Sequence, residues 1–140
     1  MNNQILSPRY ANFKIRALAY LIDLGLLSLS TCLLIAINDA LPHPNLIIFK
    51  ELAGLIISTL YHTILTASSR HGTIGKQIMK IMVVDENMQG LSLKHSFGRY
   101  LAYFFSYITL GIGFIMIIFT KKHQGLHDKI AHTYVIYREP

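Results

Sequence analysis

The stretch that decides the fold is Ala17–Ile37, which reads ALAYLIDLGLLSLSTCLLIAI and contains one charged residue, Asp23. A helix of about 20 mostly apolar residues crosses a bilayer. A helix on the surface of a soluble domain would have a charged face, and this stretch has none. It follows basic residues, but it is long, contains an acid and lacks a clear small-x-small cleavage motif. We therefore expect a retained transmembrane helix, not a signal peptide.

Two further apolar blocks follow. Leu46–Ala67 reads LIIFKELAGLIISTLYHTILTA, and Leu101–Thr120 reads LAYFFSYITLGIGFIMIIFT without any charge. The third block is interrupted at Thr109-Leu-Gly-Ile-Gly113, where two glycines favour a bend. We expect a kinked or re-entrant hairpin there, and a full third span stays as the alternative.

Composition and charge indicate one membrane domain over residues 1–140. The chain is 52% apolar and only 14% charged, against about 25% charged in an ordinary soluble domain. Its net charge is +6, yet the long apolar blocks and the lack of tryptophan argue against a nucleic-acid-binding protein. The single cysteine, Cys32, excludes a disulfide framework.

The distribution of Lys and Arg predicts the orientation. Basic residues precede the first block and follow the second and third blocks, whereas the link Asn38–Asn45 has none. Short cytoplasmic segments are the ones enriched in Lys and Arg. We therefore expect a multi-pass protein of the plasma (inner) membrane with a cytoplasmic N-terminus. Residues 1–16, 68–100 and 121–140 would be cytoplasmic, which three full spans would not allow for the tail.

The polar segments contain β-prone runs and short helices. Three runs have strand composition, and together they predict a small cytoplasmic β-hairpin or sheet beneath a mainly α-helical integral membrane fold. Two other runs are candidates for interfacial helices, the first with Thr73 as N-cap. The strand candidates are Lys80–Asp85, Leu91–Leu93 and Thr133–Tyr137, and the helix candidates are Thr73–Met79 and Leu93–Tyr100.

Polar residues lie in stripes on both predicted spans. Ionisable groups within a bilayer are costly and are functional candidates by default. Helical spacing places Arg16, Tyr20 and Asp23 on one face of the first span, together with Ser30 and Thr31. On the second span the corresponding stripe consists of Glu51, Gly54, Ser58, His62, Thr66 and Ser69.

The two stripes predict a polar seam between the helices, with two open interpretations. Asp23 and His62 would lie at similar depth, and Arg16 would lean toward Asp23. Such a seam could carry a proton or a cation, or it could only hold the helices together by hydrogen bonds. A packing role for His62 and interfacial snorkelling for Lys50 and Glu51 remain alternatives.

No motif predicts an enzyme, a metal site or a cofactor. Gly72–Lys76 lacks the spacing of a phosphate-binding loop, because Gln77 follows the lysine. His123, His127 and His132 lack the spacing of the metalloprotease motif. We expect Tyr100, Tyr103 and Tyr107 to form an interfacial aromatic belt.

Four motifs in order give the chain a specific resemblance to the RDD family of small membrane proteins. Residue Ile74 stands where proline is usual in that family, and His132 where glycine is common. The motifs are Arg16-Ala-Leu-Ala-Tyr-Leu-Ile-Asp23, Gly72-Thr-Ile-Gly-Lys76 with Met82-Val-Val-Asp85, Leu110-Gly-Ile-Gly-Phe114, and Gln124-Gly-Leu-His-Asp128-Lys-Ile-Ala-His-Thr133.

The resemblance implies a polytopic membrane protein and a suspected transporter, with sodium/proton exchange among some relatives. It implies that Arg16, Asp23 and Asp128 are the residues for which the family is named, with Asp85 as the runner-up for the second aspartate.

Our leading hypothesis is a homo-oligomeric transporter of a small cation or proton. Asp23 would be the ion or proton site, Arg16 would set its pKa, and His62 and Glu51 would be secondary sites. Asp128 would anchor the tail by capping a helix or by pairing with Lys76 or Arg16. The alternative is a structural or assembly protein whose cytoplasmic sheet docks a membrane partner.

Overall fold

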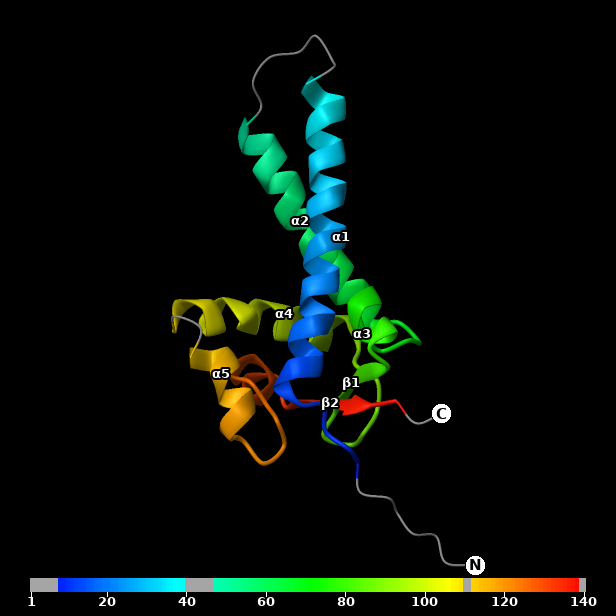
Figure 1. The fold of residues 1–140 in the computed structure, drawn as a ribbon, viewed down its shortest axis with the longest axis vertical. Coiled ribbons are helices and arrows are strands. Elements are labelled where there is room, and N and C mark those ends of the chain that lie inside the picture. Colours follow the sequence, from blue (N-terminus) through cyan, green and yellow to red (C-terminus); the bar gives the residue numbers. More distant parts are fainter. Residues whose placement is uncertain (1–7, 40–46, 110–111, 139–140) are drawn as a thin grey trace, which may run out of the picture.

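Two long helices project from a smaller globular part. The computed structural model describes residues 8–39, 47–109 and 112–138. Helices α1 (Phe13–Asp39) and α2 (Ile47–Ala67) project together, and the later elements gather at one end of them (Figure 1). The globular part contains α3 (Ile74–Ile78), β1 (Ile81–Asp85), α4 (Leu93–Ile108), α5 (Ile112–Phe119), α6 (Leu126–Ile130) and β2 (Thr133–Tyr137).

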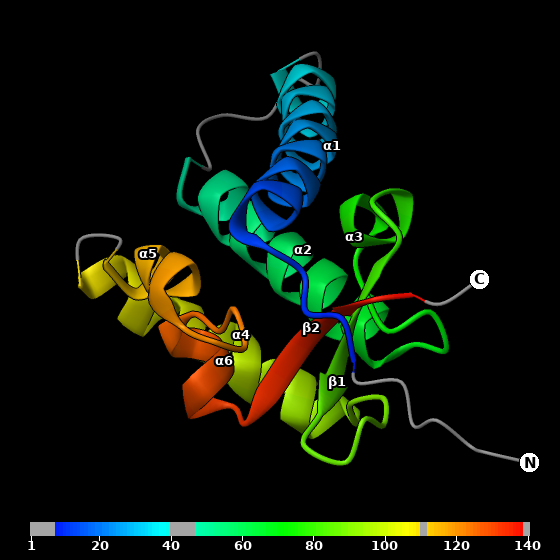
Figure 2. The same ribbon diagram turned by 60° about the horizontal axis from the view of Figure 1, so that its bottom comes forward.

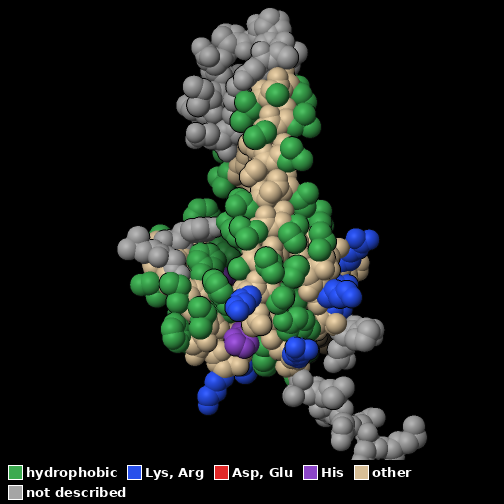
Figure 3. Space-filling model, in the orientation of Figure 1, with side chains coloured by type: hydrophobic (Ala, Val, Ile, Leu, Met, Phe, Trp, Pro, Cys, Tyr) green, Lys and Arg blue, Asp and Glu red, His purple; other side chains and the backbone are tan. Residues whose placement is uncertain are grey.

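Helix α1 has the length and hydropathy of a membrane span. It begins at a cap, because the Asn12 Oδ1 accepts a hydrogen bond of 3.1 Å from the backbone N–H of Ile15. Residues Phe13–Ile37 have a mean hydropathy of 2.0, and Leu29 is 70% exposed. Hydrophobic side chains follow α1 upward, whereas Lys and Arg gather around the globular part (Figure 3). A continuous exposed apolar surface of this kind fits a lipid environment.

Helix α2 ends at Ala67, as predicted, and its predicted start, Leu46, lies outside the described residues. Its apolar part with described side chains, Leu52–Ala67, is shorter than a full span. Among the described residues, α1 is the one helix that meets the length and hydropathy of a span, so the second span remains a prediction.

The sheet has two strands, not three. Strands β1 and β2 pair antiparallel, with Ile81 opposite Tyr137 and Asp85 opposite Thr133 (Figure 2). The prediction of a strand at Leu91–Leu93 is wrong, because only Gly90 bridges to Val84 and Leu93 already begins α4. The β-prone run there is too short to compete with the helix that follows.

The sheet forms the core of the globular part by packing against the start of α1. Alanines at the N-terminal end allow close approach of the helix to the strands. The buried cluster consists of Ala11, Ala19, Ile81, Val83, Leu91 and Val135, with Ile15, Met79 and Tyr137 packed around it.

The third apolar block is broken, and its predicted start is wrong. α4 begins at Leu93, so it includes the predicted interfacial helix and the first half of the block, while α5 forms the second half. The two helices are separate elements, and α4 lies crosswise to α1 (Figure 1). α4 buries a face with Ser96, Arg99, Ala102 and Ser106, and it exposes Phe97, Leu101, Phe104, Phe105 and Ile108.

The predicted seam between α1 and α2 is largely wrong. Ser30 and Thr31 each donate to the carbonyl of Leu27 within α1. On α2, Ser58 lies within hydrogen-bond distance (3.2 Å) of the Tyr100 hydroxyl on α4. Helix α2 packs mainly on α4, and α1 packs mainly on α3. This part of the α2 stripe therefore faces α4.

Candidate functional site

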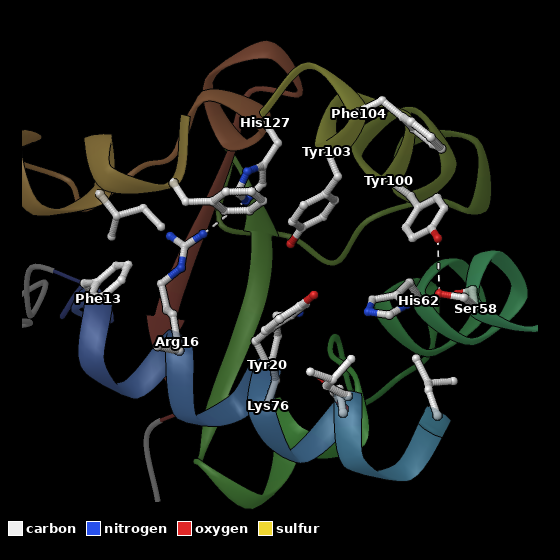
Figure 4. A pocket seen from close by; sticks show the side chains of 16 residues that line it. Phe13, Arg16, Tyr20, Ser58, His62, Lys76, Tyr100, Tyr103, Phe104 and His127 are labelled. Atoms are coloured by element: carbon white, nitrogen blue, oxygen red, sulfur yellow. Dashed lines mark hydrogen bonds between the residues drawn. The ribbon is translucent and has the colours of Figure 1, made fainter. Parts of the chain in front are cut away.

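A cavity of about 420 Å³ lies where α1 meets the globular part. Side chains from all six helices surround it (Figure 4). The lining mixes charged and polar side chains with aliphatic and aromatic ones. Its lining consists of Phe13, Arg16, Ala17, Tyr20, Asp23, Leu24, Leu27, Ser58, His62, Lys76, Tyr100, Tyr103, Phe104, Phe114, Ile117 and His127.

Beside the cavity, Asp128 binds two arginines. The Asp128 side chain is fully buried, and Arg16 from α1 donates to its Oδ2. Arg99 from α4 donates to Oδ1 at 2.5 Å. The Gly125 N–H donates to Oδ2 at 3.0 Å, which caps α6. Burial would raise the pKa of Asp128, but the charges of Arg16 and Arg99 outweigh it and hold that pKa well below its usual range.

The two arginines also bind backbone and side-chain oxygens elsewhere. Arg16 donates to the carbonyl of His123 at 2.7 Å, and Arg99 donates to the Thr133 Oγ1 at 3.1 Å. The cluster Arg16, Arg99, His127, Asp128 and Thr133, here the Asp128 cluster, thus connects α1, α4, α6 and β2.

His127 is a neutral member of this cluster. Burial and the nearby arginines lower its pKa to about 3. Its Nε2 lies 3.3 Å from the Arg16 Nη2 and 3.3 Å from the Asp128 Oδ1. Its Nδ1 lies 3.3 Å from the Ser106 Oγ. The ring stacks on Tyr103 with centroids 4.0 Å apart.

Asp23 forms a second centre on α1. It is 2% exposed, and its Oδ1 accepts from the Tyr61 hydroxyl at 2.6 Å and the Gly75 N–H at 2.7 Å. Its Oδ2 accepts from the Thr73 Oγ1 at 2.5 Å. Asp23, Tyr61, Thr73, Gly75 and Lys76 are here the Asp23 cluster. All three donors to the carboxylate are uncharged.

The expected contact between Arg16 and Asp23 is wrong. Arg16 pairs with Asp128, and the salt bridges among the described residues give Asp23 no arginine or lysine partner. The reason lies in helix geometry, because side chains tilt toward the helix N-terminus. Arg16 precedes Asp23, so its side chain extends away from that carboxylate and toward α6.

Thr73 precedes α3 as expected, but its side chain does not cap the helix. Its hydroxyl donates to the buried carboxylate of Asp23.

Lys76 is a site residue that sequence reasoning gave only a minor role. It is 9% exposed and lines the cavity, and its Nζ lies 3.5 Å from the Thr73 Oγ1. No carboxylate within the described chain lies in ion-pair distance of it. Burial lowers the pKa of Lys76. The sequence signal for Lys76 was its position after Gly75 at the start of a short helix. The glycine permits close contact of this helix with α1.

Of the other predicted site residues, His62 and Tyr20 line the cavity, whereas Asp85 lies away from it. His62 lines the cavity, and its Nδ1 donates to the carbonyl of Ser58 at 2.9 Å. Tyr20 lines the same cavity and is 45% exposed. Asp85 accepts the N–H groups of Asn87 and Gln89 in a surface turn. The side chain of Glu51 lies outside the described residues.

One correction concerns the tyrosines of the expected aromatic belt. Tyr100 and Tyr103 line the cavity, so they do not form the expected interfacial belt, and the side chain of Tyr107 lies outside the described residues. Within the described chain no three His, Cys, Asp or Glu side chains converge as metal ligands.

Helix α1 is long and apolar enough to cross a membrane, and the buried side chains of Arg16 and Asp23 place ionisable groups toward one end of it. The chain belongs to the RDD family, whose model matches residues 10–132. RDD family proteins are membrane proteins.

Curated relatives agree with the family match. The chain is 38% identical over 148 aligned positions to the uncharacterized protein YxaI of Bacillus subtilis (strain 168), which covers 91% of this chain and 97% of the relative. It is 40% identical over 65 positions to the uncharacterized protein RP437 of Rickettsia prowazekii (strain Madrid E), covering 46% of this chain and 35% of that protein. No solved structure matches the chain.

Proposed function

We propose that this RDD protein is a transporter that moves a small cation or a proton past Asp23. It would be a multi-pass protein of the inner membrane with a cytoplasmic N-terminus, and it would work as a homo-oligomer. In this orientation the cavity lies at the cytoplasmic end of α1.

The main support for this proposal is the environment of Asp23. A buried carboxylate that serves only stability is expected to pair with a cation, because an unpaired buried charge is costly. Asp23 is 2% exposed and lines the cavity, and the donors to it among the described residues are the uncharged groups of Tyr61, Thr73 and Gly75. Such a carboxylate can be neutralised by a proton or a cation that arrives through the cavity.

Lys76 supplies a second exchangeable proton. The Thr73 hydroxyl connects it to Asp23, since it accepts from the Lys76 Nζ at 3.5 Å and donates to Asp23 at 2.5 Å. A cation bound at Asp23 would repel the Lys76 ammonium and favour loss of its proton. Return of the proton would in turn expel the cation, which is the basis of an exchange cycle.

Flux in proteoliposomes tests this function. Purified protein is reconstituted, and sodium, lithium or potassium is applied against a pH gradient. We expect cation-dependent proton flux in the wild type and loss of at least nine-tenths of it, roughly, in Asp23→Asn. Asp85→Asn is the matched control and should transport normally. Flux at the wild-type rate in folded Asp23→Asn would refute the proposal.

The structural alternative has an observation of its own. Two of the donors to Asp23, Thr73 and Gly75, come from the segment around α3, so the carboxylate also fastens the globular part to α1. If this is the whole role, the wild type shows no flux and Asp23→Asn lowers the unfolding temperature. The sheet would then serve as a docking surface for a membrane partner.

A further inference from the structure

We propose that the cavity binds an amphiphilic anion, with a singly charged carboxylate or phosphodiester head at Lys76 and a hydrocarbon chain along α1, α4 and α5. This inference concerns the cavity itself. It does not depend on Asp23 carrying a proton or a cation.

The charges around the cavity favour an anion. Three cationic side chains, Arg16, Lys76 and Arg99, stand against two carboxylates, Asp23 and Asp128, which leaves one positive charge. A buried excess charge is costly unless a counter-ion joins it. A single negative charge on the ligand would bring the balance to zero.

Among the described residues, Lys76 is the cavity cation without a carboxylate in ion-pair distance. Arg16 and Arg99 are both bound to Asp128. The Lys76 ammonium is nine-tenths buried, lines the cavity and has one long hydrogen bond, to Thr73. Burial lowers the pKa of Lys76, and a bound anion would oppose that shift by favouring the charged form.

Hydroxyl groups and apolar walls indicate a ligand with both a head and a chain. The hydroxyls of Tyr20 and Tyr103 point toward the middle of the cavity, near Lys76 (Figure 4). The volume of about 420 Å³ lies in the range of small-molecule sites. A small inorganic anion would leave most of the apolar wall uncovered, and that wall consists of Phe13, Ala17, Leu24, Leu27, Phe104, Phe114 and Ile117.

The location explains how such a ligand would arrive. The cavity adjoins the part of α1 where Leu21 and Leu24 are exposed, 58% and 45% respectively. A ligand already dissolved in the bilayer can enter from this apolar surface. Its charged head would remain at the level of the globular part, where the basic residues gather (Figure 3).

Binding can be measured with defined probes. Full-length protein is reconstituted in nanodiscs of phosphatidylglycerol and phosphatidylcholine. It is then released from the nanodiscs in a native mass spectrometer, and the lipid molecules that stay bound to it are counted. In a second arm, oleate, oleyl alcohol or inorganic phosphate is added to protein in phosphatidylcholine nanodiscs. We expect retention of one phosphatidylglycerol or one oleate per chain, about tenfold preferred over phosphatidylcholine and oleyl alcohol. Preference for phosphatidylglycerol over oleate identifies the phosphodiester as the head, and the reverse identifies the carboxylate.

Matched variants locate the head group. Lys76→Met removes the charge while keeping an unbranched chain, and it should abolish the preference for the anion. Lys94→Met removes an exposed lysine of α4 that does not line the cavity, and it should leave the preference unchanged. Equal retention by wild type and Lys76→Met, or equal retention of oleyl alcohol and oleate, would overturn the proposal.

A second variant decides the matter if Lys76→Met does not fold. Ala17→Leu fills part of the cavity from α1 and should reduce oleate retention while the lysine stays in place. Unchanged retention, or inorganic phosphate binding as tightly as oleate, would contradict an amphiphile. Asp23→Asn should retain the anion even though it loses flux, so failure of the binding proposal and failure of the transport proposal are distinguishable.

Discussion

At the scale of single residues, one carboxylate organises the globular part. Asp128 receives two guanidinium groups from helices that lie far apart in the sequence, Arg16 in α1 and Arg99 in α4. All three side chains are at least nine-tenths buried. Removing one partner of such a pair leaves a buried charge uncompensated, and this is far more costly than losing a surface ion pair.

We predict that Asp128→Asn destabilises the protein by about 3–5 kcal/mol, because Arg16 and Arg99 lose their shared counter-ion. Thermal unfolding in detergent, followed by circular dichroism, measures the change. Asp85→Asn is the control, since its turn oxygen still accepts hydrogen bonds, and it should change stability by less than about 1 kcal/mol. Equal effects of the two substitutions would contradict the assignment.

The pH dependence of stability should report on His127. Its pKa is about 3 in the folded protein against 6.5 ordinarily, so between these values the unfolded chain binds more protons. Stability should therefore fall as the pH drops from 7 to 5. The contribution of Asp128 to stability is constant over this range. Its pKa is lowered in the folded protein, so this contribution is lost only near and below pH 3.8, the ordinary pKa of the group.

His127→Gln should flatten this part of the profile. Its surroundings are Arg16 on α1, Lys76 on α3, Arg99 and Tyr103 on α4, and Asp128 on α6. Unfolding midpoints measured at several pH values between 5 and 7 provide the check. A slope that persists in the variant would assign the dependence to another group.

At the scale of elements, the contact of α3 with α1 depends on a glycine. A Cβ built on Gly75 would lie 2.0 Å from the carbonyl oxygen of Ala19. The Gly75 N–H also donates to Asp23. The short helix α3 therefore rests directly on the backbone of α1, and this contact fixes Thr73 and Lys76 next to the cavity.

We predict that Gly75→Ala destabilises the protein by more than about 1 kcal/mol, because overpacking forces α3 away from α1. Gly98→Ala in α4 is the matched control, since nothing lies within 4 Å of its added Cβ. Alanine is the better helix former, so this change should be neutral or stabilising by about 0.5–1 kcal/mol. Unfolding midpoints of both variants test the pair, and an undisturbed Gly75→Ala would show that α3 is not held against α1.

At the scale of the whole molecule, the sheet brings together segments that lie far apart in the sequence. The Ala11 N–H donates to the carbonyl of Val135 at 2.8 Å, and the Tyr137 N–H donates to that of Arg9 at 2.9 Å. β1 pairs with β2. The N-terminal lead, the segment after α2 and the C-terminal strand therefore lie together, and in the proposed orientation the broken third block would return to its starting side.

Cysteine accessibility tests this topology. In a Cys32→Ala background, single cysteines replace the exposed residues Lys14 and Lys129, and a third replaces Pro42 in the link between the first two blocks. We expect an impermeant maleimide to label Pro42→Cys from outside intact cells and the other two only after permeabilisation. Labelling of Lys129→Cys together with Pro42→Cys would mean that the third block crosses the membrane.

The sequence by itself determined the long apolar first helix, the break in the third block, two of the strands and the family. These follow from composition, from glycines and from motifs along a continuous stretch, which are local properties. The sequence also drew attention to Arg16, Asp23 and Asp128, and two of its alternatives for Asp128, a helix cap and a pair with Arg16, are confirmed. It wrongly joined Arg16 to Asp23, because spacing along one helix gives the shared face but not the direction in which a side chain reaches.

Only the tertiary structure decided which polar groups meet. Asp128 lies more than one hundred residues from Arg16, and Thr73 and Gly75 lie about fifty residues from Asp23. The strand at Leu91–Leu93 gave way to α4, and Tyr100 and Tyr103 turned toward the cavity, because packing against α2 and α6 outweighs local propensity. The unpaired charge of Lys76 is likewise a property of the folded chain, since it depends on which carboxylates the other helices bring near and which they keep for the arginines.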